Sequence, residues 1–199
     1  LGINNSDDIL IYDNSDLKSS CRLWFSLLYF GHNEKKIHIL NGGLKKWIFE
    51  NKPITKDATE IIVSNYVANE KENLVVSFDQ IKKNILSKSF NVIDARSLER
   101  FEGKVSEPRK GLRSGHIQNS FCLPFNQCIN QKTGEFKNLE ELRELFNQNE
   151  NIEKRLDQVF TCGSGVTAAV LAYAYKMVNN DYIPKIYDGS WSEYGKYPA

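Results

Sequence analysis

The chain has 199 residues, of which 41% are hydrophobic and 26% are charged, and its formal net charge is +1. This composition is typical of a globular protein of one or two domains. No block of like charges indicates a nucleic-acid partner or an anionic membrane, and the longest apolar run, residues 23–30, is too short to cross a bilayer.

The first part of the chain, residues 1–53, predicts two strands that alternate with two helices. Apolar runs bounded by turn residues indicate the strands, and apolar spacings of three and four indicate the first helix. The predicted elements are a strand at 9–12, a helix over 17–28 that Gly31 terminates, a strand at 38–40 and a helix at 44–50.

Residues 54–76 predict an extended connection, and residues 77–199 predict a second unit in which strands and helices again alternate. Its predicted elements are a helix that opens with a capping box at Ser77 and Gln80, a strand at 91–95, a loop at 96–113, a strand at 120–124, a helix at 139–146, a strand at 158–161, a helix at 166–177 and a strand at 183–187. This alternation predicts an α/β fold with a mostly parallel sheet.

The two units end alike, because Leu40–Leu44 resembles Tyr187–Trp191. The strand predicted at 9–12 ends at Asp13, and the strand in the corresponding place of the second unit, at 158–161, ends at Cys162. We interpret the chain as a duplicated domain whose first copy lacks the cysteine and also lacks its own front half.

The chain opens at Leu1, without an initiator methionine and without a targeting pattern. A parallel sheet without its first strands would expose unpaired edges. We therefore expect a separate N-terminal fragment of the same protein to complete residues 1–53.

Four cysteines are present, and none forms a C-x-x-C pair. Few histidines are available to complete a zinc site, so we expect no metal. A chain of this length can build its own core, so we expect free thiols and a reducing compartment rather than a disulfide framework.

Cys162 ends a predicted parallel strand and is followed by Gly163, Ser164, Gly165 and a helix. Open α/β sheets bind ligands at such positions. The glycines allow backbone N–H groups to point at the sulfur, and the helix N-terminus adds positive potential, so the loop favours a thiolate and a bound anion. The alternative is a buried cysteine before an ordinary tight turn, and the loop alone does not separate the two.

Two arginines, Arg100 and Arg109, lie in the charged loop after the strand at 91–95. Guanidinium groups bind carboxylates in a bidentate manner, so the pair could hold an oxoacid. The alternative is a solvated loop in which Glu99, Glu102 and Glu107 pair with the arginines.

Several ordered motifs together resemble the rhodanese superfamily, and in particular its tandem-domain 3-mercaptopyruvate and thiosulfate sulfurtransferases. Residues 1–53 resemble the rear half of the family's inactive first domain, and residues 77–199 resemble its catalytic domain. The motifs are Asp94-Ala95-Arg96, Arg100-Phe101, Glu107-Pro108-Arg109, Ser114-Gly115-His116-Ile117, Cys162-Gly163-Ser164-Gly165-Val166-Thr167-Ala168 and Tyr187-Asp188-Gly189-Ser190-Trp191.

The resemblance implies a reaction in which Cys162 takes sulfur from 3-mercaptopyruvate as a persulfide, releases pyruvate and passes the sulfur to a small thiol, thioredoxin or cyanide. Arg100 and Arg109 would hold the carboxylate and keto groups of this small anionic donor. Ser164 would relay a proton, although the family's partners for that relay lie in the front half of the first domain, which this chain lacks. No cofactor is implied, and the compartment would be the cytoplasm or, in a eukaryote, the mitochondrion.

The resemblance also implies supporting residues. Backbone amides would stabilise the sulfur anion, and other side chains would hold the loops and the wall of the cleft. The implied amides are those of Gly163, Gly165, Val166 and Thr167, and the implied supports are Asp94, Arg96, His116, Asp188 and Ser190.

Three other activities compete with this hypothesis. Thiosulfate sulfurtransferases typically carry basic residues where this loop has Gly163 and Ser164, so thiosulfate is expected to be the poorer donor. A related phosphatase would need a longer loop that ends in arginine, whereas residue 168 is alanine. A non-catalytic rhodanese-like binding module would commonly lack the cysteine.

Overall fold

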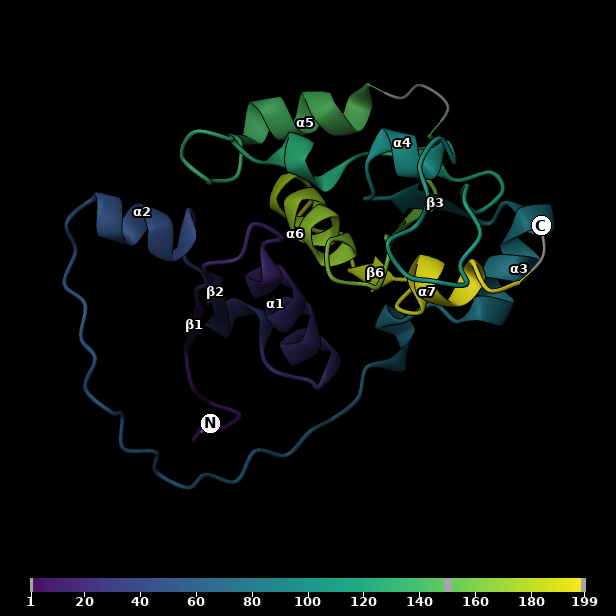
Figure 1. Cartoon of the computed structure of the whole chain (residues 1–199). Coiled ribbons are helices and arrows are strands. Elements are labelled where there is room, and N and C mark those ends of the chain that lie inside the picture. The colour runs from purple at the N-terminus through teal and green to yellow at the C-terminus, as the bar shows by residue number, and fades with distance from the viewer. Residues whose placement is uncertain (1, 149–151, 198–199) are drawn as a thin grey trace.

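The structure, a computed structural model, describes residues 2–148 and 152–197, so residue 1 and residues 149–151 and 198–199 of the predicted second unit lie outside the described part. Two parallel sheets organise the molecule, one of two strands in the first unit and one of four strands in the second (Figure 1). The predicted α/β fold with parallel sheets flanked by helices is confirmed.

The first unit, residues 2–53, contains β1 (Ile9–Ile11), α1 (Ser19–Tyr29), β2 (Ile37–Ile39) and α2 (Gly43–Phe49). Strands β1 and β2 pair in parallel, with Ile9 opposite Ile37. Helix α1 ends as expected at Gly31, whose φ is 83°, and the N–H groups of Gly31 and His32 bond to the carbonyls of Leu28 and Leu27 at 3.0 and 2.9 Å. A 3-10 turn at Glu34–Lys36 was not predicted.

The connection between the units follows the outside of the first unit as extended chain before a 3-10 turn at Glu72–Leu74 (Figure 1). Its later part is bonded to the end of α1, because the N–H groups of Asn69 and Lys71 donate to the carbonyls of Phe30 and Tyr29 at 3.0 and 2.7 Å. These bonds fix the path by which the chain reaches the second unit.

The second unit, residues 77–197, has the strand order β4-β3-β5-β6, and all of its strands are parallel. The capping box at Ser77 and Gln80 is confirmed. The elements are α3 (Phe78–Ser87), β3 (Phe90–Asp94), α4 (Leu98–Phe101), β4 (Phe121–Cys122), a 3-10 helix at Phe125–Cys128, α5 (Leu139–Asn147), β5 (Asp157–Thr161), α6 (Ala168–Val178), β6 (Lys185–Ile186) and α7 (Ser190–Tyr194).

Three features of the second unit differ in detail from the sequence predictions. Residues 96–113 were expected to be a loop throughout, but they include α4, a single turn too short to show an apolar period. Helix α7, five residues that begin at Ser190, was not predicted. The helix expected from Val166 begins at Ala168, because the residues before it form the loop around the cysteine.

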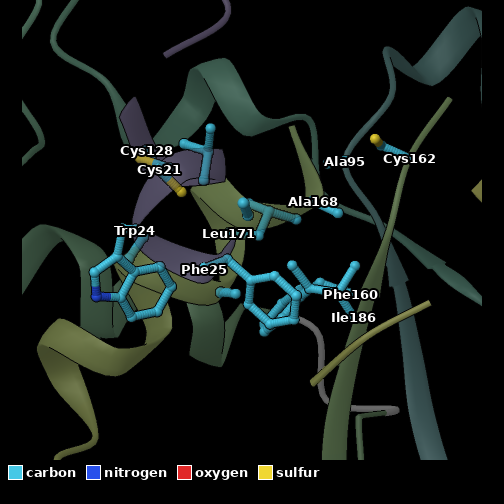
Figure 2. Packing of buried hydrophobic residues seen from close by; sticks show 14 of the residues in the cluster. Cys21, Trp24, Phe25, Ala95, Cys128, Phe160, Cys162, Ala168, Leu171 and Ile186 are labelled. Carbon is cyan, nitrogen blue, oxygen red and sulfur yellow. The ribbon is translucent and has the colours of Figure 1, made fainter. Parts of the chain in front are cut away.

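The core joins the two units, because α1 packs against α6. Trp24 and Tyr173 meet edge to face with their ring centroids 5.0 Å apart, and Trp24, Phe25 and Leu171 are fully buried or nearly so. Figure 2 shows the α1 side chains beside Leu171, Phe160 and Ile186 of the second unit. This shared core places the N-terminal half of α1 close to the loop that carries Cys162.

Candidate active site

Cys162 lies directly after β5, and its side chain is almost completely buried, with 2% of its surface exposed. Two backbone N–H groups point at its sulfur, those of Gly165 at 3.1 Å and Ser164 at 3.4 Å. We call residues 162–167 the cysteine loop. Its curled backbone surrounds the sulfur with donors, which is the environment that an anionic sulfur requires.

Helix α7 holds the other side of the cysteine loop. The N–H groups of Trp191 and Ser192 donate to the carbonyls of Cys162 and Gly163, each at 2.9 Å. The buried Ser190 hydroxyl accepts from the Cys162 N–H at 3.3 Å and donates to the Tyr187 carbonyl at 2.9 Å. These bonds satisfy the carbonyls on the α7 side of the loop, while the amides of Ser164 and Gly165 face the sulfur.

Arg100 and Arg109 converge on Gly163. A Cβ atom added to Gly163 would lie 3.1 Å from Nη2 of Arg100 and 3.6 Å from Nη1 of Arg109. Arg109 also approaches the Gly163 carbonyl at 3.5 Å. The structure therefore brings the two predicted donor-binding arginines together beside the cysteine, with their guanidinium groups next to Gly163.

Glu107 positions Arg100, a role that its place in the Glu107-Pro108-Arg109 motif did not by itself predict. Its carboxylate is 1% exposed and bonds to Arg100 at 2.6 and 3.2 Å and to Arg96 at 2.8 Å. The pairing of a loop glutamate with Arg100 is therefore present, but the loop is not solvated at Glu107, because a buried carboxylate that holds two guanidinium groups is part of an ordered network. The sequence feature that could have indicated this role is the motif Glu107-Pro108-Arg109.

Asp94 and Arg96 form the base of this network. Both side chains are 1% exposed, and Asp94 accepts bonds from the backbone and the guanidinium of Arg96 at 2.7 to 3.1 Å. Burial works against the charge on Arg96, but the bonds from Asp94 and Glu107 outweigh it and raise the pKa of Arg96. Arg96 also stacks on the Trp191 ring at 4.5 Å, which connects the network to α7.

His116 lies away from the sulfur. Its ring stacks on Phe101 with centroids 4.0 Å apart, and its Nδ1 bonds to the Phe101 carbonyl at 2.8 Å. These contacts place His116 beside α4, the helix that carries Arg100.

The remaining predicted residues of the cysteine loop differ in their contacts. Ser164 is half-buried, and within the described residues no hydrogen bond orients its hydroxyl. Val166 and Thr167 lead into α6, and neither of their amides bonds to the sulfur in the structure. Only the amides of Ser164 and Gly165, among those of the described loop, reach the sulfur.

Asp188, predicted as a support, bonds to a residue that the sequence analysis did not consider. Its carboxylate forms an ion pair with Arg22 of α1, and the same guanidinium approaches the Gly165 carbonyl at 3.5 Å. No sequence signal indicated Arg22, because it lies 143 positions from Gly165.

Known proteins resemble this chain in sequence and in fold. The family model of the rhodanese-like domain matches residues 77–197, which is more than half of the chain. The chain belongs to the rhodanese family. The predicted membership is thereby confirmed, and the matched residues include the whole cysteine loop and α7.

Curated relatives of this rhodanese-family chain include two kinds of sulfurtransferase. The mitochondrial thiosulfate/3-mercaptopyruvate sulfurtransferase 1 of Arabidopsis thaliana is 35% identical over 100% of this chain and 56% of its own length. The human 3-mercaptopyruvate sulfurtransferase is 35% identical over 98% of this chain and 64% of its own length. The thiosulfate sulfurtransferase of Gallus gallus is 34% identical over 98% of this chain and 65% of its own length. The chain thus spans less than two thirds of each of these relatives.

Solved structures show the same fold. SseA from Escherichia coli, described as a 3-mercaptopyruvate sulfotransferase, superposes with a TM-score of 0.81 at 31% identity, over 96% of this chain and 70% of its own. Tum1 of Saccharomyces cerevisiae gives a TM-score of 0.82 at 25% identity, over 98% of this chain and 68% of its own. In both cases the similarity extends across the two units.

The other three cysteines of this rhodanese-family chain are free thiols in less reactive surroundings. Burial raises the pKa of the Cys122 and Cys128 thiols to about 12 and raises that of Cys21 still further. A cavity of about 560 Å³ lies beside Cys122 and shares no lining residue with the cysteine loop. Figure 2 shows Cys21 and Cys128 on the opposite side of the core from Cys162.

Among the described residues, no group of three or more His, Cys, Asp or Glu side chains is arranged to hold a metal ion. No helix in this part of the chain is long and apolar enough to cross a membrane.

Proposed function

We propose that the chain is a sulfurtransferase that moves sulfur from 3-mercaptopyruvate to a thiol acceptor through a persulfide on Cys162. One observation carries the proposal: the Cys162 sulfur receives two backbone N–H groups beside a glycine on which two guanidinium groups converge. A nucleophilic sulfur, donors for an anionic sulfur and an anion clamp are the parts that such a transfer needs.

The chemistry of the first half-reaction follows from these positions. The Cys162 thiolate attacks the sulfur of the donor, and a sulfur–sulfur bond forms while the bond between that sulfur and C3 of the donor breaks. The electron pair of the broken bond passes to C3 as the enolate of pyruvate, which then takes a proton. The amides of Ser164 and Gly165 stabilise the sulfur anions before and after the transfer.

The second half-reaction returns the enzyme to its starting state. The thiolate of a small thiol or of thioredoxin attacks the outer sulfur of the persulfide, and the Cys162 thiolate leaves. Cyanide can serve as a simple acceptor in the same step, with thiocyanate as the product. We therefore propose that the sulfur acceptor is a thiol or cyanide.

The charge of the site supports a donor with a single negative charge. The charged network around the cysteine loop contains four guanidinium groups and three carboxylates, which leaves one positive charge beside the Cys162 sulfur. 3-Mercaptopyruvate carries one carboxylate, whereas thiosulfate carries two negative charges. We therefore propose a preference for 3-mercaptopyruvate, and the relatives, which include both kinds of enzyme, leave this preference open. The residues counted are Arg22, Arg96, Arg100, Arg109, Asp94, Glu107 and Asp188.

The decisive measurement is the intact mass of the 199-residue chain after incubation with 3-mercaptopyruvate or with thiosulfate. We expect a gain of one sulfur atom with the first donor, little gain with the second, and no gain in the Cys162→Ser variant. A larger gain with thiosulfate would support the alternative donor. No gain with either would support a rhodanese-like binding module instead.

The charge argument has its own test in Glu107→Gln. This change removes one carboxylate and keeps the shape of the side chain, so the site gains a positive charge. We expect the ratio of kcat/KM for thiosulfate to that for 3-mercaptopyruvate to rise by about tenfold, because one unit charge at contact distance is worth about 1–4 kcal/mol. Glu99→Gln, at an exposed position on α4, is the matched control and should leave the ratio unchanged.

A further inference from the structure

Arg22 reaches from the first unit into the cysteine loop of the second. Its guanidinium pairs with Asp188 and approaches the Gly165 carbonyl at 3.5 Å. The Arg22 side chain is 33% exposed and that of Asp188 is 43% exposed, so the pair lies at the edge of the molecule rather than in its core.

Gly165 lies between this ion pair and the sulfur. Its φ is 79°, and a Cβ atom added there would lie 2.5 Å from Oδ1 of Asp188 and 2.9 Å from Nη1 of Arg22. Its N–H, on the other side, donates to the Cys162 sulfur at 3.1 Å. The ion pair therefore packs directly against the residue whose amide points at the nucleophile.

Comparison of α1 with α6, the helix in the equivalent place of the second unit, indicates that the fold does not require an arginine at position 22. The Leu44 N–H bonds to the Asp13 carbonyl as the Trp191 N–H bonds to that of Cys162, so Asp13 and Cys162 are equivalent. Helices α1 and α6 begin six residues after these two, which makes Leu171 the counterpart of Arg22. Leu171 is completely buried in the core, whereas Arg22 extends to the loop of the other unit.

We propose that Arg22 is a positioning residue: with Asp188 it fixes the peptide groups of Gly165, so that the Gly165 N–H is held toward the Cys162 sulfur. The first unit thereby contributes to the reactivity of a cysteine that it does not contain. This inference rests on the proposed function only in treating Cys162 as the nucleophile.

Two explanations of the Arg22–Asp188 pair, a positioning role and a simple electric field, predict opposite effects on Cys162 when the Asp188 charge is removed. If the pair acted only through its charges, loss of the Arg22 charge would make Cys162 less reactive toward an alkylating reagent at a given pH, and loss of the Asp188 charge would make it more reactive. If the pair holds Gly165, either loss loosens the same amide and makes Cys162 less reactive. The other charged groups around the loop, which stay unchanged in the comparison, are Asp94, Arg96, Arg100, Glu107 and Arg109.

The experiment is the pH dependence of alkylation at Cys162 by iodoacetamide, followed by mass at the peptide that contains Cys162. It uses the whole chain and no sulfur donor, so it can succeed even if persulfide formation fails. The variants are Arg22→Gln, Asp188→Asn and both together. Lys45→Gln is the matched control, because Lys45 of the first unit pairs with Asp16 on the surface, away from the loop.

We expect both single variants to move the midpoint of the alkylation profile upward by roughly one pH unit, which is about a tenfold loss of rate below the midpoint. The double variant should be no worse than the more affected single variant, because both changes break one interaction. Lys45→Gln should leave the midpoint in place.

Two results would overturn the proposal. One is a midpoint that rises in Arg22→Gln and falls in Asp188→Asn, which would leave only a field effect. The other is an unchanged midpoint in Arg22→Gln. Should Arg22→Gln fail to fold by thermal melting, Arg22→Lys serves instead, since it keeps the charge but lacks the planar group that spans Asp188 and Gly165. An upward shift in that variant supports the proposal, and an unchanged profile overturns it.

Discussion

The segment between β1 and α1 and the segment between β5 and α6 occupy similar places in their units but contain different anions. Asp13 and Cys162 each lie six residues before the following helix, and the carbonyl of each accepts a bond from the first turn of a later helix at 2.9 Å. In the first loop, residues 13–18, the carboxylate of Asp13 accepts from the Ser20 N–H at 2.6 Å and from the Ser19 hydroxyl at 3.2 Å. In the cysteine loop, the sulfur accepts from backbone amides of the loop itself.

This difference shows how one scaffold serves structure in one unit and chemistry in the other. Donors at a helix N-terminus stabilise an anion wherever they occur. In the first loop, the fixed carboxylate of Asp13 uses those donors permanently, which caps α1. In the cysteine loop, a sulfur atom can gain and lose a second sulfur while the same donors remain in place.

The backbone of the two loops also differs. The first loop places its left-handed residue at its end, where Lys18 has a φ of 52°. The cysteine loop places it in the middle, where Gly165 has a φ of 79°. The central left-handed residue turns the amide of Gly165 toward the sulfur, whereas the first loop has no such turn at its counterpart, Asp16.

The largest expected effect comes from replacing the cysteine of the cysteine loop by the aspartate that stands at the equivalent position of the first loop. In Cys162→Asp we expect sulfur transfer to fall by at least about a thousandfold, because the nucleophile is lost. The loop amides can bond to the new carboxylate, so the fold should persist in circular dichroism. The reciprocal exchange, Asp13→Cys in the Cys162→Asp background, should gain no persulfide by intact mass, because no arginine pair is among the described contacts of residue 13. Sulfur transfer by the Cys162→Asp variant would contradict the assignment of the nucleophile.

The next effect tests the left-handed turn. Gly165→Ala adds a Cβ atom that meets Asp188 and Arg22 at a positive φ, so we expect a loss of about 1–3 kcal/mol in the free energy of unfolding. Persulfide formation should slow by about tenfold or more, because the amide at the sulfur is displaced. The control, Asp16→Ala, removes only a surface ion pair and should cost less than about 1 kcal/mol in urea denaturation. Equal losses in the two variants would show that the turn is not special.

Ser190 and its counterpart Gly43 give a smaller effect. Both residues have a positive φ, 51° and 59°. Ser190→Ala leaves the Cys162 N–H without its partner and should cost about 1–3 kcal/mol in the free energy of unfolding. Ser190→Gly loses the same bond but relieves the backbone, so it should be more stable than Ser190→Ala by about 1 kcal/mol. Thermal melts of the two variants make the comparison, which fails if the alanine variant is the more stable.

The smallest effect at neutral pH concerns the thiols outside the cysteine loop. Burial raises the pKa of Cys128 from its ordinary value of 9.0 to about 12, so the folded state keeps a proton that the unfolded state releases first. This contribution to stability is complete below about pH 9 and is lost as the pH rises toward about 12. Urea denaturation between pH 8 and 10 should show a falling free energy of unfolding, and the slope should be shallower in Cys128→Ala. An identical slope would contradict the prediction.

Much of the fold followed from local patterns in the sequence. The apolar spacing in α1, the glycine at its end and the capping box before α3 depend on neighbours within a turn or two of helix, so they could be predicted. Helices α4 and α7 could not, because a helix of four or five residues has no period to detect and is held by contacts with distant parts of the chain. Trp191, for instance, bonds through its ring N–H to the Arg113 carbonyl at 2.8 Å.

The kind of chemistry could be predicted from residue types and spacings: a cysteine after a strand, glycines after the cysteine and arginines in a loop. How these groups are held depends on the folded arrangement of the two units. The burial of Glu107 between two arginines and the contact of Arg22 with the cysteine loop depend on side chains that are far apart in sequence or that could equally have been solvated. Spacing along the chain cannot specify such contacts, because they arise when the shared core of α1 and α6 brings the two units together.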